Sequence, residues 1–403
     1  MQGMAPVAIA NLGNLEMKKV LLGTSALLGA GLVASPAFAA DGIKLSLGGY
    51  FKTSVDVNID DNGQSDLGHN RDASMVSSDA EIYFLGKTTL DNGLTVGARV
   101  ELEGEQKTGD QIDAAFVYFQ GGFGELRIGS QNSALASSCI TPVGGSANFG
   151  AFSQTSINNN AFVDTFAGSA TICEGVDSEN ASGGANGKSQ KVVYVTPSFG
   201  GFQLALSWSP NDNHESGNGH VVMNSTNTGD QKQIVDAYAS YVHDFDGFSV
   251  QWGGGGSWAL ATDGDSNKKK SFYQTGLNLT FGGFSVGGAF EYMKDVNARF
   301  DATTGDFVSN HGGDMWVAGG GLAYTFDAWT VGAQYSYSHI DGVDSSGSNR
   351  KVHQIELTGQ YAMGPGINLD AGIGYAHASG SSDDAAHGGY DSFNIGLGTS
   401  FTF

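Results

Sequence analysis

Apolar and polar residues alternate along most of the chain from residue 43 to its last residue. In the first such segment the odd positions from Ile43 to Ile59 are mostly apolar, and the even positions are mostly polar. The last segment alternates in the same way and ends in Phe401-Thr402-Phe403. A period of two places apolar side chains on one face of a β-strand and polar side chains on the other. The pattern therefore predicts an all-β protein.

The alternation predicts sixteen strands, several of them longer than the about 9–11 residues that cross a bilayer at a tilt. They are expected at 43–59, 79–90, 94–106, 111–121, 123–131, 189–197, 201–209, 232–244, 247–260, 271–281, 283–295, 314–326, 328–340, 350–362, 366–378 and 391–403. An even number suits an antiparallel barrel whose two ends lie on one side. The assignment of faces is unclear for 111–121, 189–197 and 232–244.

The connections between these strands are alternately short and long. The short ones are Gly-, Asn- or Pro-containing turns of hairpin length, such as Asp91-Asn92-Gly93 and Gly364-Pro365-Gly366. The long ones lie near 60–78, 132–188, 210–231, 296–313, 341–349 and 379–390. Outer-membrane barrels have this asymmetry, with tight periplasmic turns and long outward loops. A large soluble β-sandwich would also alternate, but it has no reason to keep its short turns at one end.

The first 39 residues have the features of a targeting segment. Lys18 and Lys19 precede an apolar stretch from Val20 to Val33, and Ala37-Phe38-Ala39 is a small-x-small cleavage signature. Met17 is the expected natural start, which makes residues 1–16 an upstream extension. Residues 40–403 are expected to form a single domain. No later stretch approaches 18 uninterrupted apolar residues, so a membrane-spanning domain would have to cross with strands.

Composition agrees with a barrel and excludes nucleic acid as a partner. Gly accounts for 62 of 403 residues, and charged residues for only 15%. Soluble globular chains carry about 25% charged residues. Net charge is −22, from 19 basic and 41 acidic residues, whereas phosphate contacts need clustered Lys and Arg. Removal of Glu16, Lys18 and Lys19 with the targeting segment leaves 17 − 40 = −23, which suggests a mild preference for cations.

Three short motifs resemble the general bacterial porin family of Gram-negative bacteria. They are Gly48–Phe51, Gly121–Gly129 and Tyr194–Phe202. The resemblance implies a homotrimer of 16-stranded barrels in the outer membrane, surrounded by lipid and lipopolysaccharide. Each barrel would pass small hydrophilic solutes by diffusion, past a third long loop folded into its lumen. Phe401 and Phe403 resemble the family's C-terminal signal for the barrel-assembly machinery.

The connection 132–188 is the third connection on its side of the predicted barrel, after 60–78 and the short one between 94–106 and 111–121, so it matches the family's constriction loop. At about 57 residues (132 to 188) it is far longer than ordinary connections. It contains Cys139 and Cys173, the two cysteines of the chain. In a secreted chain two cysteines most simply form one disulfide, and here it would make the constriction more rigid. Two free thiols, or a metal held by both, are the alternatives.

The resemblance also indicates which charged residues would select solutes. Family porins place basic wall residues across from loop acids, and the resulting transverse field favours polar solutes. On this basis we expect Lys52, Arg99 and Arg127 on the wall. The loop is expected to contribute Asp164, Glu174 and Asp177.

No cofactor is expected, although two acidic turns resemble calcium-loop chemistry. These turns are Asp60-Asp61-Asn62-Gly63 and Asp263-Gly264-Asp265, and both lack the full 12-residue ligand pattern. An enzyme is disfavoured, since His-Glu-x-x-His is absent. A secreted β-rich adhesion or binding protein is a further alternative. Among channels, a substrate-specific pore for a sugar or a charged nutrient is the closest competitor.

Overall fold

The computed structural model describes residues 42–60, 74–104, 112–152, 172–177, 188–212, 231–262, 268–296, 299–301, 306–308, 313–341, 349–379 and 390–403. Its strands are β1 (Lys44–Asp60), β2 (Ser74–Thr89), β3 (Thr95–Glu103), β4 (Ile112–Gly121), β5 (Gly124–Ser130), β6 (Gln190–Val195), β7 (Phe202–Asn211), β8 (Gln231–Phe245), β9 (Phe248–Thr262), β10 (Ser271–Phe281), β11 (Phe284–Val296), β12 (Arg299–Asp301), β13 (Asp306–Val308), β14 (Gly313–Phe326), β15 (Trp329–Ile340), β16 (Arg350–Gly364), β17 (Ile367–Ser379) and β18 (Tyr390–Thr402).

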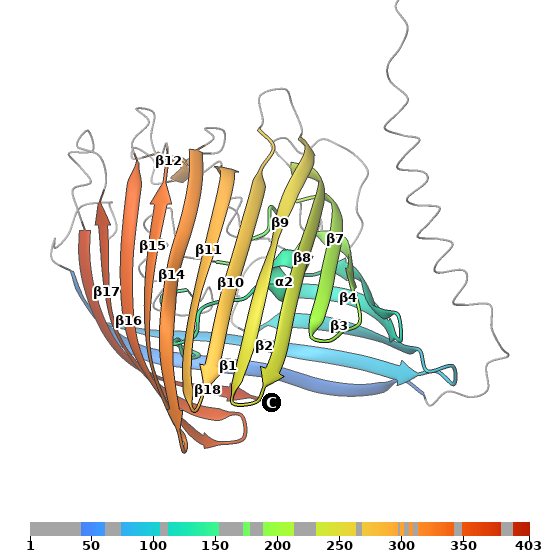
Figure 1. The fold of residues 1–403 in the computed structure, drawn as a ribbon, viewed down its shortest axis with the longest axis horizontal. Coiled ribbons are helices and arrows are strands. Elements are labelled where there is room, and N and C mark those ends of the chain that lie inside the picture. Colours follow the sequence, from blue (N-terminus) through green and yellow to red (C-terminus); the bar gives the residue numbers. More distant parts are fainter. Residues whose placement is uncertain are drawn as a thin grey trace, which may run out of the picture.

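Within the described ranges, sixteen of these strands close into one antiparallel barrel (Figure 1). Closure occurs where β1 pairs with β18, with Phe51 opposite Phe401. The predicted number of strands and their antiparallel closure are confirmed. None of the described helices has the length and apolar character needed to cross a membrane.

The predicted alternation of faces holds along most of the wall. On β1 the outward side chains of Val55 and Val57 are 57% and 42% exposed, whereas the inward Ser54 and Asp56 are fully buried. Large apolar side chains are exposed in this way on nearly every strand of the barrel. The outer surface is therefore apolar, as contact with lipid requires.

Tight turns join the strands at one rim. Gly282 and Gly283, between β10 and β11, both have positive φ (54° and 85°), as a two-residue hairpin turn of the type I′ class requires. Two details differ from the sequence-based expectation. β2 begins five residues before the predicted residue 79, because Ser74–Ser78 continue to pair with β1. The short pair β12–β13, which was not predicted, forms a separate two-stranded sheet.

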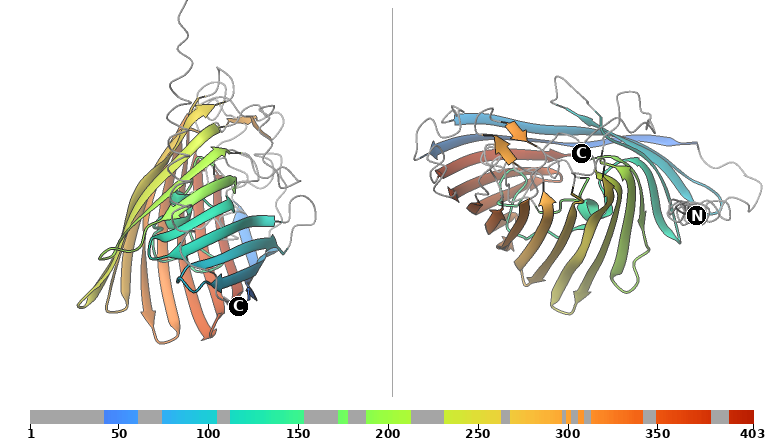
Figure 2. Two further views of the ribbon diagram at one scale, coloured as in Figure 1. Left: turned by 90° about the vertical axis from the view of Figure 1, so that its right-hand side faces the viewer. Right: turned by 90° about the horizontal axis from the view of Figure 1, so that it is seen from above.

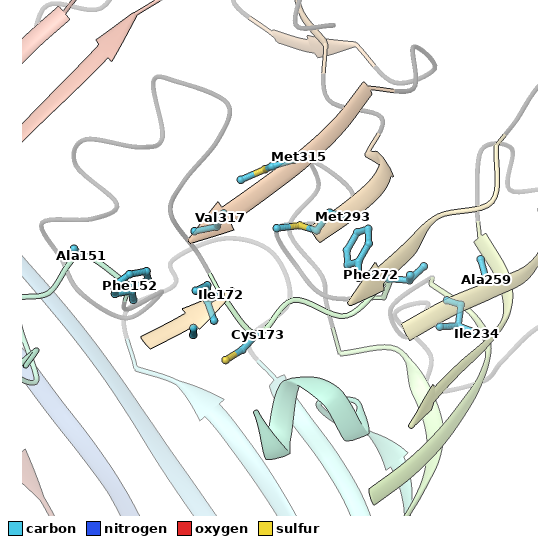
Figure 3. Packing of buried hydrophobic residues seen from close by; sticks show 12 residues of the cluster. Ala151, Phe152, Ile172, Cys173, Ile234, Ala259, Phe272, Met293, Met315 and Val317 are labelled. Atoms are coloured by element: carbon cyan, nitrogen blue, oxygen red, sulfur yellow. The ribbon is translucent and has the colours of Figure 1, made fainter. Parts of the chain in front are cut away.

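Part of the inner wall is lined by a cluster of large apolar side chains. Ile234, Phe272, Met293, Met315 and Val317 project inward from β8, β10, β11 and β14 and are buried in one cluster. Figure 3 shows them facing Phe152 and Ile172, which belong to the connection between β5 and β6. Because that connection covers these residues, they need not be polar. This explains why the face assignment of 232–244 was unclear from the sequence.

Candidate functional site: a segment inside the barrel

The connection between β5 and β6 runs inside the barrel in two described limbs. We call residues 131–152 the first limb and residues 172–177 the second limb. The first limb contains the short helix α2 (Ala134–Ser138), which lies inside the ring of strands (Figure 2, right). Backbone N–H groups of Ala134 and Leu135 donate to Ser207 Oγ (3.0 Å) and Asp236 Oδ2 (3.2 Å). Wall side chains thus hold the start of α2 against β7 and β8.

After α2, a row of wall amides and one hydroxyl holds the backbone carbonyls of the first limb. Gln274 donates to the Ile140 carbonyl and Asn278 to that of Thr141, each at 2.9 Å. Gln334 donates to the carbonyls of Pro142 and Val143 at 2.9 and 3.1 Å. Thr358 Oγ1 donates to Gly144 at 2.7 Å. Side chains of β10, β15 and β16 therefore bind five consecutive backbone carbonyls, those of residues 140–144.

Gln334 binds the first limb at two points. Besides donating to Pro142 and Val143, its Oε1 accepts the Ala151 N–H at 2.8 Å. Asn148 donates to Asp370 Oδ2 on β17 at 2.7 Å. The limb is thereby attached to the wall along 140–151.

Glycines in the wall let the limb lie directly on the sheet. A Cβ on Gly321 (β14) would overlap the Val143 carbonyl, and a Cβ on Gly332 (β15) would overlap that of Gly144. On β17 and β18, Gly372 and Gly396 similarly accommodate the ring of Phe149. Any larger side chain at these positions would push the limb further into the lumen.

The second limb is held by charged and hydroxyl side chains. Glu291 of β11, which is fully buried, accepts the N–H groups of Cys173 (2.6 Å) and Glu174 (3.1 Å). Ser257 of β9 accepts the Val176 N–H at 2.9 Å. Asp177 forms an ion pair with Lys191 of β6 at 2.8 Å.

A disulfide between Cys139 and Cys173 joins the two limbs, as predicted. It connects the end of α2 to the apolar cluster, in which Cys173 is buried. The two limbs therefore form one cross-linked unit that is bound to β6–β11 and to β15–β17.

The predicted basic wall residues lie on β1, β3 and β5, and each is paired with an acid. Lys52 binds Asp79 (2.7 Å), and Arg99 binds Glu101 (2.5 Å). Arg127 is paired with Glu125. A fourth base, Lys188, contacts Glu101 at 3.6 Å and is also paired with Asp113. Lys188 was not among the predicted residues. Its place at the end of the loop, just before β6, could have indicated that it lies close to the wall.

Three carboxylates gather beside these ion pairs. The strand register places Glu81 of β2 directly opposite Glu103 of β3. A carboxylate oxygen of each lies within 4.8 Å of the others and of one from Asp113. Like charges directly opposite each other in a sheet destabilise it. Of the three acids, Asp113 is compensated by its ion pair with Lys188.

The loop acids predicted to face solutes have different surroundings. Glu174 and Asp177 are 1% and 2% exposed, and their contacts are with the wall. This burial favours a role in positioning the limb. Asp164 lies outside the described residues, as do Asp61–Gly63 and Asp263–Asp265 of the two acidic turns.

The C-terminal residues complete the barrel seam. Phe403 exchanges two backbone hydrogen bonds with Gly49, at 3.0 and 3.1 Å, and its side chain is 66% exposed. Phe401 is 40% exposed.

One sequence motif associated with hydrolases occurs at residues 283–287, which read Gly-Phe-Ser-Val-Gly. In α/β-hydrolases this spacing puts a nucleophilic serine on a strand-to-helix turn. Here it begins at the β10–β11 hairpin, and Ser285 is hydrogen-bonded to Thr280 Oγ1 at 2.9 Å. The motif therefore lacks the backbone setting that makes such a serine reactive.

A closed barrel with an inward segment is the architecture of a diffusion channel, and comparison with known proteins identifies the family. The family model for Gram-negative porins matches residues 23–381. The chain belongs to the Gram-negative porin family. It is an outer-membrane protein that forms a channel for passive diffusion.

Two curated relatives and several solved porins resemble the chain. A monosaccharide porin of a Halomonas species and the major outer membrane protein of Halomonas elongata are each 23% identical over 367 residues, covering 80% of this chain and 92% of the relative. An anion-selective porin from Comamonas acidovorans has a TM-score of 0.56 at 16% identity, covering 90% of this chain and all of that one. The trimer form of OmpT from Vibrio cholerae has a TM-score of 0.55 at 14% identity, with the same coverage. At these identities the solved structures support the fold alone.

Proposed function

We propose that this porin admits small hydrophilic solutes through the space beside the inward segment, with a preference for cations. The observation that carries the charge preference is the cluster of Glu81, Glu103 and Asp113 on the wall. The neighbouring bases Lys52 and Arg99 are ion-paired with acids outside this cluster. Lys188 is paired with Asp113 of the cluster itself, so Glu81 and Glu103 carry the preference. A carboxylate about 5 Å from the ion path attracts a cation by about 0.8 kcal/mol in water before salt screening.

Reversal potentials in a salt gradient across planar bilayers test this preference. The wild-type channel should be cation-selective, and Glu81→Gln/Glu103→Gln should lower the cation-to-anion permeability ratio by about twofold after screening. Asp246→Asn, in the β8–β9 turn, removes one charge away from the cluster and should leave the ratio unchanged. Anion selectivity of the wild-type channel would contradict the proposal.

Sugar specificity is a second candidate, because one curated relative is described as a monosaccharide porin. Two lumen tyrosines that could stack on a sugar ring already have cations over their faces. Arg99 lies 4.1 Å from the Tyr83 centroid, and Lys52 lies 4.6 Å from that of Tyr50. Liposome swelling with glucose and with uncharged solutes of equal size would distinguish the candidates, since general diffusion predicts rates that follow size.

We further propose that the chain assembles as a homotrimer, supported by the trimer form of OmpT. Chemical cross-linking in mild detergent should then trap a three-chain species. Recognition of Phe401 and Phe403 by the barrel-assembly machinery, and contact with lipopolysaccharide, also stay predictions.

A further inference from the structure

Two histidines face each other on the outer surface of the barrel near its rim. The register places His353 of β16 directly opposite His377 of β17. Both point outward, since Ile355 and Tyr375 on the same sides of these strands are 47% and 43% exposed. They lie three and two residues from the strand ends Arg350 and Ser379. Those ends lead into long connections, which in outer-membrane barrels lie at the cell surface.

Flanking strands fix the orientation of both imidazole rings. Nδ1 of His353 is hydrogen-bonded to the Tyr335 hydroxyl on β15 at 2.7 Å. On the opposite side, Nδ1–H of His377 donates to Asp391 Oδ1 on β18 at 2.7 Å. The strand order is β15-β16-β17-β18, so each Nδ1 faces away from the other histidine. The Cδ2–Nε2 edges of the two rings therefore face the gap between them.

We propose that His353 and His377 bind a divalent transition-metal ion through their Nε2 atoms. Imidazole suits ions such as Cu²⁺, Ni²⁺ and Zn²⁺. Metal–nitrogen bonds of about 2.0–2.1 Å place the ion about 3.2 Å from each ring centroid, so two rings sharing an ion are at most about 6.4 Å apart. The observed centroid separation is 6.3 Å. A tetrahedral angle would bring the rings about 1 Å closer, a shift that a side-chain rotation can supply because His377 is 37% exposed.

The surrounding residues support this binding mode. A metal-bound histidine usually donates its other ring N–H to a carboxylate or another oxygen, as His377 does to Asp391. Tyr335 would accept Nδ1–H from His353 and so select the tautomer with a bare Nε2. Tyr337 packs edge-on against His353 at 4.6 Å and limits its rotation. Lys351, on the same strand, is the nearby charge that opposes a cation.

Titration of the purified, folded protein in detergent with Cu²⁺ tests the proposal. Electron paramagnetic resonance should show copper bound by two imidazole nitrogens. His353→Gln and His377→Gln should each weaken binding at this site more than tenfold. Asp391→Asn should weaken it about tenfold, as loss of an outer hydrogen-bond partner does. His339→Gln is the matched control. His339 lies near the same rim, but its Nε2, the atom that binds the metal in this proposal, is already hydrogen-bonded to Asp341 at 2.9 Å.

The fold of each variant is checked by its heat-dependent shift in electrophoretic mobility. If the wild type and His353→Gln/His377→Gln bind Cu²⁺ alike, the proposal is wrong. It is also wrong if His339→Gln weakens binding as much as His377→Gln.

Discussion

Lys191 of β6 and Asp177 of the second limb form an ion pair of 2.8 Å in which the two side chains are 0% and 1% exposed. Ser189 Oγ also donates to the same carboxylate oxygen, at 2.9 Å. The pair joins the end of the inward segment to the strand that follows it. Because both charges are removed from water, each needs the other.

Replacement of one partner of this pair should release the second limb. Lys191→Met leaves Asp177 as a buried charge without its base, which costs about 3–5 kcal/mol. We expect larger current fluctuations in single-channel recordings. Lys191→Met/Asp177→Leu removes both charges and should show smaller current fluctuations than the single variant. Lys87→Met, at an exposed position on β2, is the control, and equal noise in Lys191→Met and this control would contradict the role assigned to the pair.

Gln334→Ala should loosen the first limb. The change removes hydrogen bonds to Pro142, Val143 and Ala151, each worth about 1 kcal/mol net. Conductance should become more variable, and larger neutral solutes should enter in a size-exclusion assay. Gln120→Ala is the control. It also removes a glutamine amide, but one near the β4–β5 turn that does not belong to the row of wall amides. An unchanged exclusion size in Gln334→Ala would show that the other wall amides suffice.

Gly321→Ala should displace the first limb by steric contact alone. The added methyl group would overlap the Val143 carbonyl, whereas the methyl group of Gly359→Ala has open space around it. Both changes add one carbon to neighbouring parts of the same wall. We expect altered single-channel conductance for Gly321→Ala only. Matching conductances for the two variants would mean that the limb does not rest on Gly321.

The burial of Lys270 should make the protein more stable at alkaline pH. It lies just before β10, and burial lowers its pKa to about 8, although the Asp212 carboxylate opposes the shift. Between pH 8 and 10.5 the unfolded state binds more protons than the folded state, so the free energy of unfolding should increase with pH across this window. A shift from 10.5 to 8 corresponds to about 3 kcal/mol.

Thermal unfolding of the wild type and of Lys270→Met, followed by electrophoretic mobility, checks this prediction. The wild type should gain stability between pH 8 and 10, and the variant should gain less. Lys269→Met is the adjacent exposed control. Parallel pH profiles for the wild type and Lys270→Met would remove Lys270 as the cause.

The interior of the pore was only partly predictable from the sequence. Alternation along β1 and β3 predicts that Lys52 and Arg99 lie on the inner face, because successive side chains of a strand point to opposite sides. The ion pairs that these bases make depend on register with β2 and on side-chain reach. The amide row could have been suspected from Gln274, Asn278 and Gln334, which share the inward face with glycines. Nothing in the sequence indicated that these amides would bind carbonyls from residues 140–143.

The sequence by itself determined the strands, their number and the apolar outer face, because alternation and turn residues act over a few neighbouring positions. It also indicated the disulfide, since the chain has two cysteines. Only the tertiary structure decided where the inward segment rests. That depends on contacts between residues as far apart as Gly144 and Thr358, and on glycines whose missing side chains matter only once another backbone lies against them.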